Sequence, residues 1–149
     1  MKDTDRAYLA AMIDGEGCIH ITNTHVTRKD IKGNPRKRYN RLMVIVVNTD
    51  RLLMETVKKR SNHKGRMIRV SPQNDRCRPQ YRLEWRGKYA AAFLSEVEAF
   101  MSPRKQEQAL VGIEFYERCM QKTVSHAGLT KENLKERTYY EQRLKHLKT

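Results

Sequence analysis

The stretch Gln80–Arg86 alternates residue by residue between apolar and polar side chains. The two alternating sets are Tyr81, Leu83 and Trp85 on one side and Gln80, Arg82, Glu84 and Arg86 on the other. A period of two is typical of a strand that packs one face on a core and leaves the other open. The chain must therefore form a sheet of which one face is covered and the other is polar.

Three further stretches have strand character, and helical patterns separate them. Strands are expected over 18–26, 39–48 and 66–70, and helices over 6–14, 51–60, 88–101, 103–121 and from 131 onward. The expected N-caps are Thr4 or Asp5, Thr49 or Asp50, Ser102 and Thr130. This order predicts a single α+β domain over residues 1–149, in which helices cover one face of an antiparallel sheet.

Positive charge is concentrated in the central part of the chain. The net charge is +14, and residues 18–88 hold nineteen basic and five acidic side chains, so the flanking segments are balanced. Such a localised field indicates a phosphate backbone as the partner. A solvated basic surface without a specific ligand is the alternative. An anionic membrane fits less well, because the basic segment is predicted to form strands.

Several absences point to an intracellular protein. No apolar run approaches the roughly 18 residues that a membrane span needs, and the polar start Met1–Asp5 does not resemble a secretory signal. Cys18, Cys77 and Cys119 are far apart and have neither metal-ligand nor redox spacing. We expect no membrane association, and a location in the cytoplasm of a prokaryote or phage-infected cell, or in an organelle.

The basic excess falls on the strands and loop that would surround the open face. A ribbon of strands can enter the major groove of DNA and present polar side chains to base edges, where Arg suits guanine. The loop 28–38 is basic enough to follow a phosphate backbone. The candidates for DNA contact are His20, Thr22, Thr24, Arg28, Lys29, Arg36, Lys37, Arg38, Arg41, Arg66, Arg69, Gln80, Arg82, Glu84 and Arg86. The alternative is a sheet face that is merely solvated.

The first helix is expected to carry a narrow stripe of small residues. Small side chains let the backbones of two helices approach closely, and the opposite stripe of the helix can fill a core. The small stripe is Ala7, Ala10, Ala11 and Asp14, and the apolar stripe is Tyr8, Leu9, Met12 and Ile13. Gly15 and Gly17 would then end the helix, so that Glu16 lies just beyond it.

The segment Leu9–Gly17, with the letters L-A-A-M-I-D-G-E-G, resembles the signature of the LAGLIDADG homing endonucleases. The resemblance implies an αββαββα fold with extra C-terminal helices, whose antiparallel sheet forms a DNA-binding saddle. It also implies that the carboxylate of Glu16 and the backbone carbonyl of Gly15 bind Mg²⁺, or Mn²⁺ or Ca²⁺ in the same site. Because the chain has one copy of the motif, a homodimer is implied in which the two-fold axis pairs both stripes and both carboxylates.

A second segment, Phe100–Ala109, resembles the family segment K-Q-x-Q-A at the start of a later helix. It implies that Lys105 is the basic residue near the scissile phosphate, where it stabilises negative charge or orders the attacking water. The family also places a polar and a basic residue at the end of its second strand. Asn48 and Arg51 are the candidates here, although Asp50 and Arg51 could simply start a helix.

The resemblance implies a site-specific enzyme that hydrolyses both strands of a long, pseudo-palindromic double-stranded DNA target. Two alternatives on the same fold are an RNA maturase that helps an intron to splice and a DNA-binding regulator that has lost catalysis. The presence of both Glu16 and Lys105 argues against such a loss.

Overall fold

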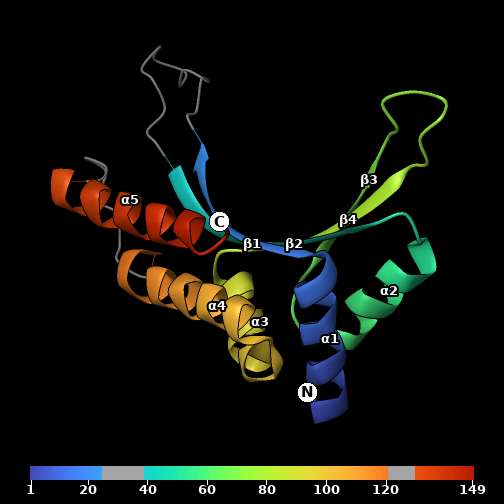
Figure 1. The fold of residues 1–149 in the computed structure, drawn as a ribbon, viewed down its shortest axis with the longest axis horizontal. Coiled ribbons are helices and arrows are strands. Elements are labelled where there is room, and N and C mark those ends of the chain that lie inside the picture. Colours follow the sequence, from blue (N-terminus) through green and yellow to red (C-terminus); the bar gives the residue numbers. More distant parts are fainter. Residues whose placement is uncertain (25–38, 121–129) are drawn as a thin grey trace.

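The chain folds as a curved four-stranded sheet with helices against its convex face (Figure 1). A computed structural model describes residues 1–24, 39–120 and 130–149, apart from the side chains of residues 24 and 39. The strands are β1 (Gly17–Thr24), β2 (Tyr39–Asn48), β3 (Arg66–Val70) and β4 (Gln80–Arg86). The helices are α1 (Asp3–Glu16), α2 (Arg51–Arg60), α3 (Lys88–Val97), η1 (Glu98–Phe100), α4 (Pro103–Phe115), η2 (Tyr116–Met120) and α5 (Lys131–His146). The expected α+β class and the expected order of elements are confirmed.

The sheet is antiparallel throughout, in the order β1-β2-β4-β3. Val44 of the central strand β2 pairs with Ile19 of β1 and Trp85 of β4, and all three are completely buried. Paired residues of an antiparallel sheet share a face, so this set marks the covered side. The concave side is open, and the β1–β2 and β3–β4 arms rise beside it like the sides of a saddle (Figure 1).

The core lies between the covered face and the helices α1, α3 and α4. Leu9 and Ile13 of α1 are buried in it, as the apolar stripe predicted. Trp85 of β4 stacks on Phe93 of α3, with ring centroids 4.2 Å apart and planes 5° from parallel. Burial of two large aromatic side chains in contact is among the larger contributions that single residues make to a core.

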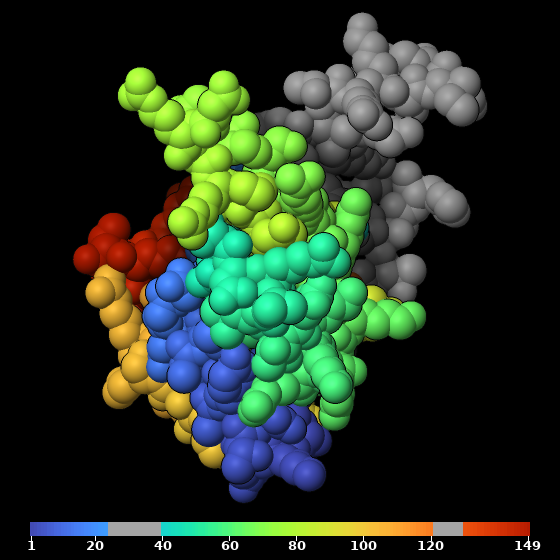
Figure 2. Space-filling model, turned by 90° about the vertical axis from the view of Figure 1, so that its right-hand side faces the viewer, coloured from blue at the N-terminus to red at the C-terminus, as the bar shows by residue number. Residues whose placement is uncertain are grey.

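Two contacts, one on each side of the molecule, position the outer helices α2 and α5. Beside α1, the guanidinium of Arg60 at the end of α2 lies 4.4 Å from the centroid of the Tyr8 ring, and the two helices are adjacent on the surface (Figure 2). On the other side, buried Arg137 of α5 donates hydrogen bonds to the backbone carbonyls of Asn40 and Cys119. This second contact fixes α5 against the start of β2 and against η2. None of the helices in the described segments is long and apolar enough to cross a bilayer.

The bounds of β2, α2, β3 and β4 are those expected from the sequence, and Asp50 and Thr130 cap their helices through side-chain oxygens. Three expectations were wrong. Helix α1 starts at Asp3 with Lys2 in the cap position, so neither Thr4 nor Asp5 is its cap. The single helix expected over 88–101 ends at Val97 and continues as the short turn η1, and the helix from 103 changes to the wider π form at Tyr116.

The end of α1 also differs from expectation, because the helix continues through Gly15 and Glu16 and stops at Gly17. The amide of Gly17 closes the last turn on the carbonyl of Ile13. A Cβ atom on Gly17 would lie 2.6 Å from the Cα of Ile13, so only glycine fits this close passage from helix to strand. Gly15, by contrast, has open space where a side chain would project.

The Phe93–Trp85 stack provides a test of the core. Replacing Phe93 by Ala should lower the free energy of unfolding by about 3–5 kcal/mol, because it removes a buried ring and leaves a cavity under Trp85. Urea denaturation followed by circular dichroism measures this loss. Phe100→Ala is the matched control, since Phe100 is 43% exposed and its loss should cost less than about 1 kcal/mol. Equal losses for both variants would contradict this account of the core.

Candidate active site and nucleic-acid interface

Glu16 is the last residue of α1 and lies at the point where the helix meets the sheet. It is exposed, and its carboxylate has no hydrogen-bond or ion-pair partner among the described residues. The last turn of α1 contains no basic residue. The carbonyl end of a helix carries partial negative charge, so the end of α1 favours a cation from elsewhere.

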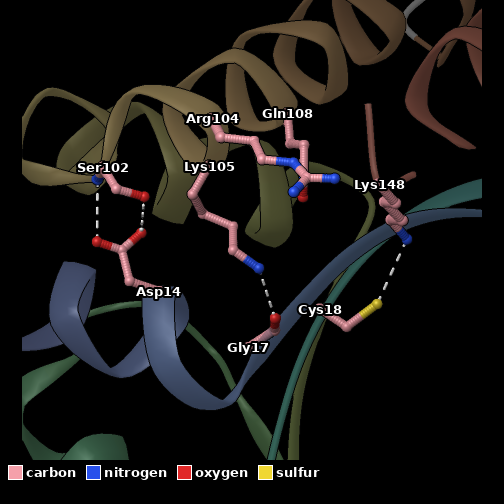
Figure 3. A pocket seen from close by; sticks show the side chains of 8 residues that line it. All are labelled: Asp14, Gly17, Cys18, Ser102, Arg104, Lys105, Gln108 and Lys148. Carbon is pink, nitrogen blue, oxygen red and sulfur yellow. Dashed lines mark hydrogen bonds between the residues drawn. The ribbon is translucent and has the colours of Figure 1, made fainter. Parts of the chain in front are cut away.

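Lys105 brings a cation to this point from a distant part of the chain. Its Nζ atom donates a hydrogen bond to the backbone carbonyl of Gly17 at 2.8 Å, across 88 residues of sequence (Figure 3). The two segments that carry the sequence motifs therefore meet in space, and Lys105 lies next to the residue after Glu16.

Asp14 joins the two motif segments. Its carboxylate accepts hydrogen bonds from the backbone amide of Ser102 at 2.9 Å and from the Ser102 hydroxyl at 3.1 Å (Figure 3). Ser102 occupies the N-cap position of α4, although its own side chain does not cap the helix. A carboxylate at a helix N-terminus is favourable, so Asp14 stabilises the start of α4 and fixes the turn from which Lys105 extends.

A cleft of about 370 Å³ opens between the end of α1 and the start of α4. Its charged lining is Arg104, Lys105 and Lys148 against Asp14, and Cys18 and Gln108 complete its polar wall. The carbonyl of Leu147 accepts hydrogen bonds from Arg104 at 3.0 Å and from Gln108 at 3.2 Å, which holds residues 147–149 over one side. The excess of basic groups suits a phosphate rather than a cationic ligand.

The lining residues Arg104, Gln108 and Lys148 were not among the sequence candidates. Arg104 and Gln108 belong to the second motif segment, so their proximity to Lys105 could have been inferred from helical spacing. Lys148 could not, because it arrives from the end of α5 and its Nζ contacts the Sγ of Cys18 at 3.4 Å. No local pattern indicates a contact over that separation.

Asn48 and Arg51 do not line this cleft and have local partners. The side-chain oxygen of Asn48 accepts a hydrogen bond from the amide of Asp50 at 2.9 Å. Arg51 forms an exposed ion pair with Glu55 at 2.7 Å. These contacts organise the start of α2, and a catalytic role for either residue stays a prediction.

The described residues contain no group of three or more His, Cys, Asp or Glu side chains that could hold a metal ion. A single chain offers the carboxylate of Glu16 and nearby backbone carbonyls. These are the oxygen donors that Mg²⁺ and Ca²⁺ prefer, so the residues present are compatible with a divalent ion but provide only part of a coordination shell.

The open face combines polar strands with an apolar centre. In the register of the sheet, Thr22 pairs with Arg41, and Arg66 pairs with Glu84. His20 pairs with Met43, which in turn pairs with Arg86 of β4. Strand β2 contributes Met43, Ile45 and Val47 to this face, so most of its polar groups come from the neighbouring strands. Burial, together with the charges of Lys148 and Arg82, lowers the pKa of His20, which is therefore neutral at pH 7.

Glu84 lies under two arginines on this face. Its side chain is fully buried, and its carboxylate accepts hydrogen bonds from Arg82 at 2.8 Å and from Arg86. Burial alone would raise the pKa of Glu84, but the hydrogen bond from Arg82 and the charge of Arg86 outweigh it and lower that pKa. Glu84 was expected to contact DNA directly; in the structure its two oxygens are occupied and it instead fixes the arginines.

Other expected DNA contacts divide into three groups. Arg41, Arg66, Gln80, Arg82 and Arg86 lie on the open face with His20 and Thr22. Arg69 lies opposite Tyr81 on the helix side of the sheet, so it does not share the open face, and its contact with DNA stays a prediction. The side chain of Thr24 and the residues Arg28, Lys29, Arg36, Lys37 and Arg38 lie outside the described residues.

Similar folds occur among solved structures. Neither family models nor curated proteins match the sequence. The homing endonuclease I-CvuI, in complex with the I-CreI target and 2 mM Mg, aligns with a TM-score of 0.73 and 16% identity over 97% of this chain and 82% of that chain. With its own target and 2 mM Ca, I-CvuI aligns with a TM-score of 0.71 and 18% identity over 98% of this chain and 85% of that chain. The LAGLIDADG meganuclease I-AabMI, bound to uncleaved DNA, aligns with a TM-score of 0.65 and 16% identity over 91% of this chain and 43% of that chain. The chain has the fold of the LAGLIDADG homing endonucleases.

Within this LAGLIDADG fold, the small-residue stripe of α1 is only partly on the surface. Ala7 and Ala11 are exposed. Ala10 is completely buried in the core of the same chain, and Asp14 is engaged by Ser102. Ala10 was therefore wrongly assigned to a surface for a second copy, and the small residues available for such a contact are Ala7, Ala11 and Gly15.

The Arg82–Glu84–Arg86 triad predicts a defined pH dependence. Glu84→Gln should lower the free energy of unfolding by about 1–3 kcal/mol at pH 7, because two charge-assisted hydrogen bonds to a buried group are lost. The folded-state pKa of Glu84 is below its unfolded value, so its stabilisation is full above the unfolded pKa. The difference between wild type and variant should shrink as pH falls through the lowered folded pKa.

Urea denaturation at a series of pH values checks this prediction. The matched control is Glu107→Gln, which changes an exposed acid on α4 that has no partner among the described residues. The control should follow the wild type at every pH. A difference for Glu84→Gln that stays constant down to pH 2 would contradict the assigned ionisation.

Proposed function

We propose that the chain is a metal-dependent DNA endonuclease that cuts both strands of a long, pseudo-palindromic duplex as a homodimer. The observation that carries the proposal is the contact of Lys105 with the carbonyl of Gly17, the residue that follows Glu16. This contact supports a site in which Glu16 is an anionic metal ligand and Lys105 is a cation for phosphate. The fold supports the same conclusion, since I-CvuI and I-AabMI have this fold and are bound to DNA.

The roles of the residues follow from their charges and positions. Glu16 and the carbonyl of Gly15 would hold a divalent ion, which supplies an activated water and stabilises the leaving oxygen. Lys105 stabilises negative charge that develops on the phosphate, with Arg104 and Lys148 adding to the positive potential of the cleft. Asp14 acts by positioning, because it fixes the turn that carries Lys105.

A second copy of the chain would complete the site. One chain supplies one Glu16, and two chains related by a two-fold axis supply two. The chain aligns with less than half of I-AabMI, so a pair of such chains would match the whole of that protein in length. The exposed residues Ala7 and Ala11 offer the surface on which two α1 helices can approach closely.

The catalytic assignment predicts that Glu16→Gln abolishes cleavage and preserves DNA binding, because the amide keeps the size of the side chain but not its charge. Lys105→Gln should slow cleavage by about 10²–10³-fold.

Cleavage is measured with Mg²⁺ on the intron-less insertion site of the protein's own gene. DNA binding is measured on the same site by gel shift without Mg²⁺. Glu107→Gln is the control and should cut at the wild-type rate. Full activity of Glu16→Gln would refute the assignment, and tight RNA binding without cleavage of any DNA would favour the maturase alternative.

The pairing of α1 helices can be tested separately. Ala11→Gln should weaken dimerisation by about 5- to 150-fold, because a longer side chain in a close helix contact costs about 1–3 kcal/mol. Analytical ultracentrifugation measures the dissociation constant. Ala92→Gln, at an exposed alanine of α3, is the matched control and should leave it unchanged. A wild-type chain that stays monomeric at micromolar concentration with DNA present would exclude the homodimer.

A further inference from the structure

Two side chains of α4 hold the carbonyl at the end of α5. Leu147, the C-cap of α5, accepts hydrogen bonds through its backbone oxygen from Arg104 at 3.0 Å and from Gln108 at 3.2 Å. The last carbonyls of a helix have no partner within it, so donors from a neighbouring helix stabilise its end and fix its direction. We call these two hydrogen bonds the Leu147 clamp.

The Leu147 clamp determines where Lys148 lies, because Lys148 is the next residue along the chain. Its Nζ atom reaches the Sγ of Cys18 in β1 at 3.4 Å. Lys105, which belongs to α4, donates to the carbonyl of the preceding strand residue, Gly17. Two ammonium groups from two helices therefore reach consecutive positions of β1 (Figure 3).

The charge of Lys148 is available to a further partner. Lys148 forms no ion pair with the residues that the structure describes, and the sulfur of Cys18 is only a weak hydrogen-bond partner. Its charge is also sensed by a neighbour: burial lowers the pKa of His20, and the ammonium of Lys148 lowers that pKa further. The pKa of His20 therefore reports where Lys148 lies.

Gln108 has no other evident reason to be polar. Its side chain is 5% exposed, and burying an amide costs free energy unless the amide is hydrogen-bonded. The bond to Leu147 meets that requirement. Gln108 is uncharged, so it does not add to the positive potential of the cleft, and its effect on a phosphate must pass through Leu147 and Lys148.

We infer that Gln108 is a positioning residue for DNA cleavage, which holds the end of α5 so that Lys148 lies beside Lys105 at the scissile phosphate. The inference rests on the proposed function. Both ammonium groups would then stabilise negative charge that develops on the phosphate. The pair is built from α4 and α5 together, so the chemistry depends on how these two helices dock.

The first test needs neither DNA nor activity and follows the His20 ring by NMR as pH is varied. Lys148→Gln should raise the pKa of His20 toward the ordinary value for histidine, since a positive neighbour is lost. Gln108→Met keeps the length of the side chain but not its donor, and it should raise the pKa in the same direction. The matched control is Gln106→Met, because the amide of Gln106 donates to Glu98 at 2.8 Å instead, and it should leave the pKa unchanged.

The second test compares rates of DNA cleavage at saturating protein. Lys148→Gln should lower the rate by about 10- to 100-fold, and Gln108→Met by about 2- to 10-fold through loss of one hydrogen bond. Both should change the dissociation constant for DNA less than the rate. The double variant should cut no more slowly than Lys148→Gln alone, because Gln108 acts through Lys148. Gln106→Met should cut at the wild-type rate.

Three results would overturn the inference. They are a pKa of His20 that shifts in Lys148→Gln but not in Gln108→Met, rate losses that multiply in the double variant, and wild-type rates in both single variants. Thermal melting shows whether Gln108→Met is folded. If it is not, Arg104→Gln removes the other half of the Leu147 clamp at an exposed side chain for the NMR test. A wild type that cuts no DNA would refute the proposed function, and the NMR comparison would still decide whether Gln108 positions Lys148.

Discussion

The hydrogen bonds from Ser102 to Asp14 connect the two parts of the chain on which the active-site arrangement depends. They join the last turn of α1 to the first turn of α4, and both turns carry a charge that their own helix dipole disfavours. Glu16 lies at the negative end of α1, and Lys105 lies at the positive end of α4. Bringing the two ends together places Lys105 at the carbonyl end of α1 and the carboxylate of Asp14 at the start of α4, where each charge offsets the dipole of the other helix. The same junction therefore stabilises the fold and brings Lys105 to the residue that follows Glu16.

The close passage at Gly17 gives this junction its direction. Since a Cβ atom there would collide with Ile13, the chain can leave α1 only by turning directly into β1. The carbonyl of Gly17 is then available to Lys105, while Glu16 stays on the surface. A longer connection would leave the acid on a loop, where its position relative to Lys105 would vary. A helix end followed at once by a strand holds a functional side chain more firmly than a loop does.

The sequence predicted the sheet well and the contacts across it less well. Strict alternation and an N-cap gave the bounds of β4 and α2, because both are local properties of the chain. Strand β3 is short and has no clear polar and apolar alternation, so the sequence did not indicate that Arg69 lies on the helix side of the sheet. Ala10 was misassigned because a stripe of small residues looks the same whether it meets the core or a second helix. Lys148 was missed because the contact depends on how α5 packs, which no nearby residue encodes.

Charged side chains are distributed differently at the two ends of the central strands. At one end, Lys105 contacts the carbonyl of Gly17, the residue that follows the exposed acid Glu16. At the other end, a cleft is lined by Lys64, Arg66 and Lys88, which form no ion pair among the residues described. Mutual repulsion in such a cluster destabilises the free protein slightly, and a bound polyanion removes that cost while it releases counterions. Glu84 lies between the two ends, where its buried charge keeps Arg82 and Arg86 ordered and so limits the repulsion that the fold must tolerate.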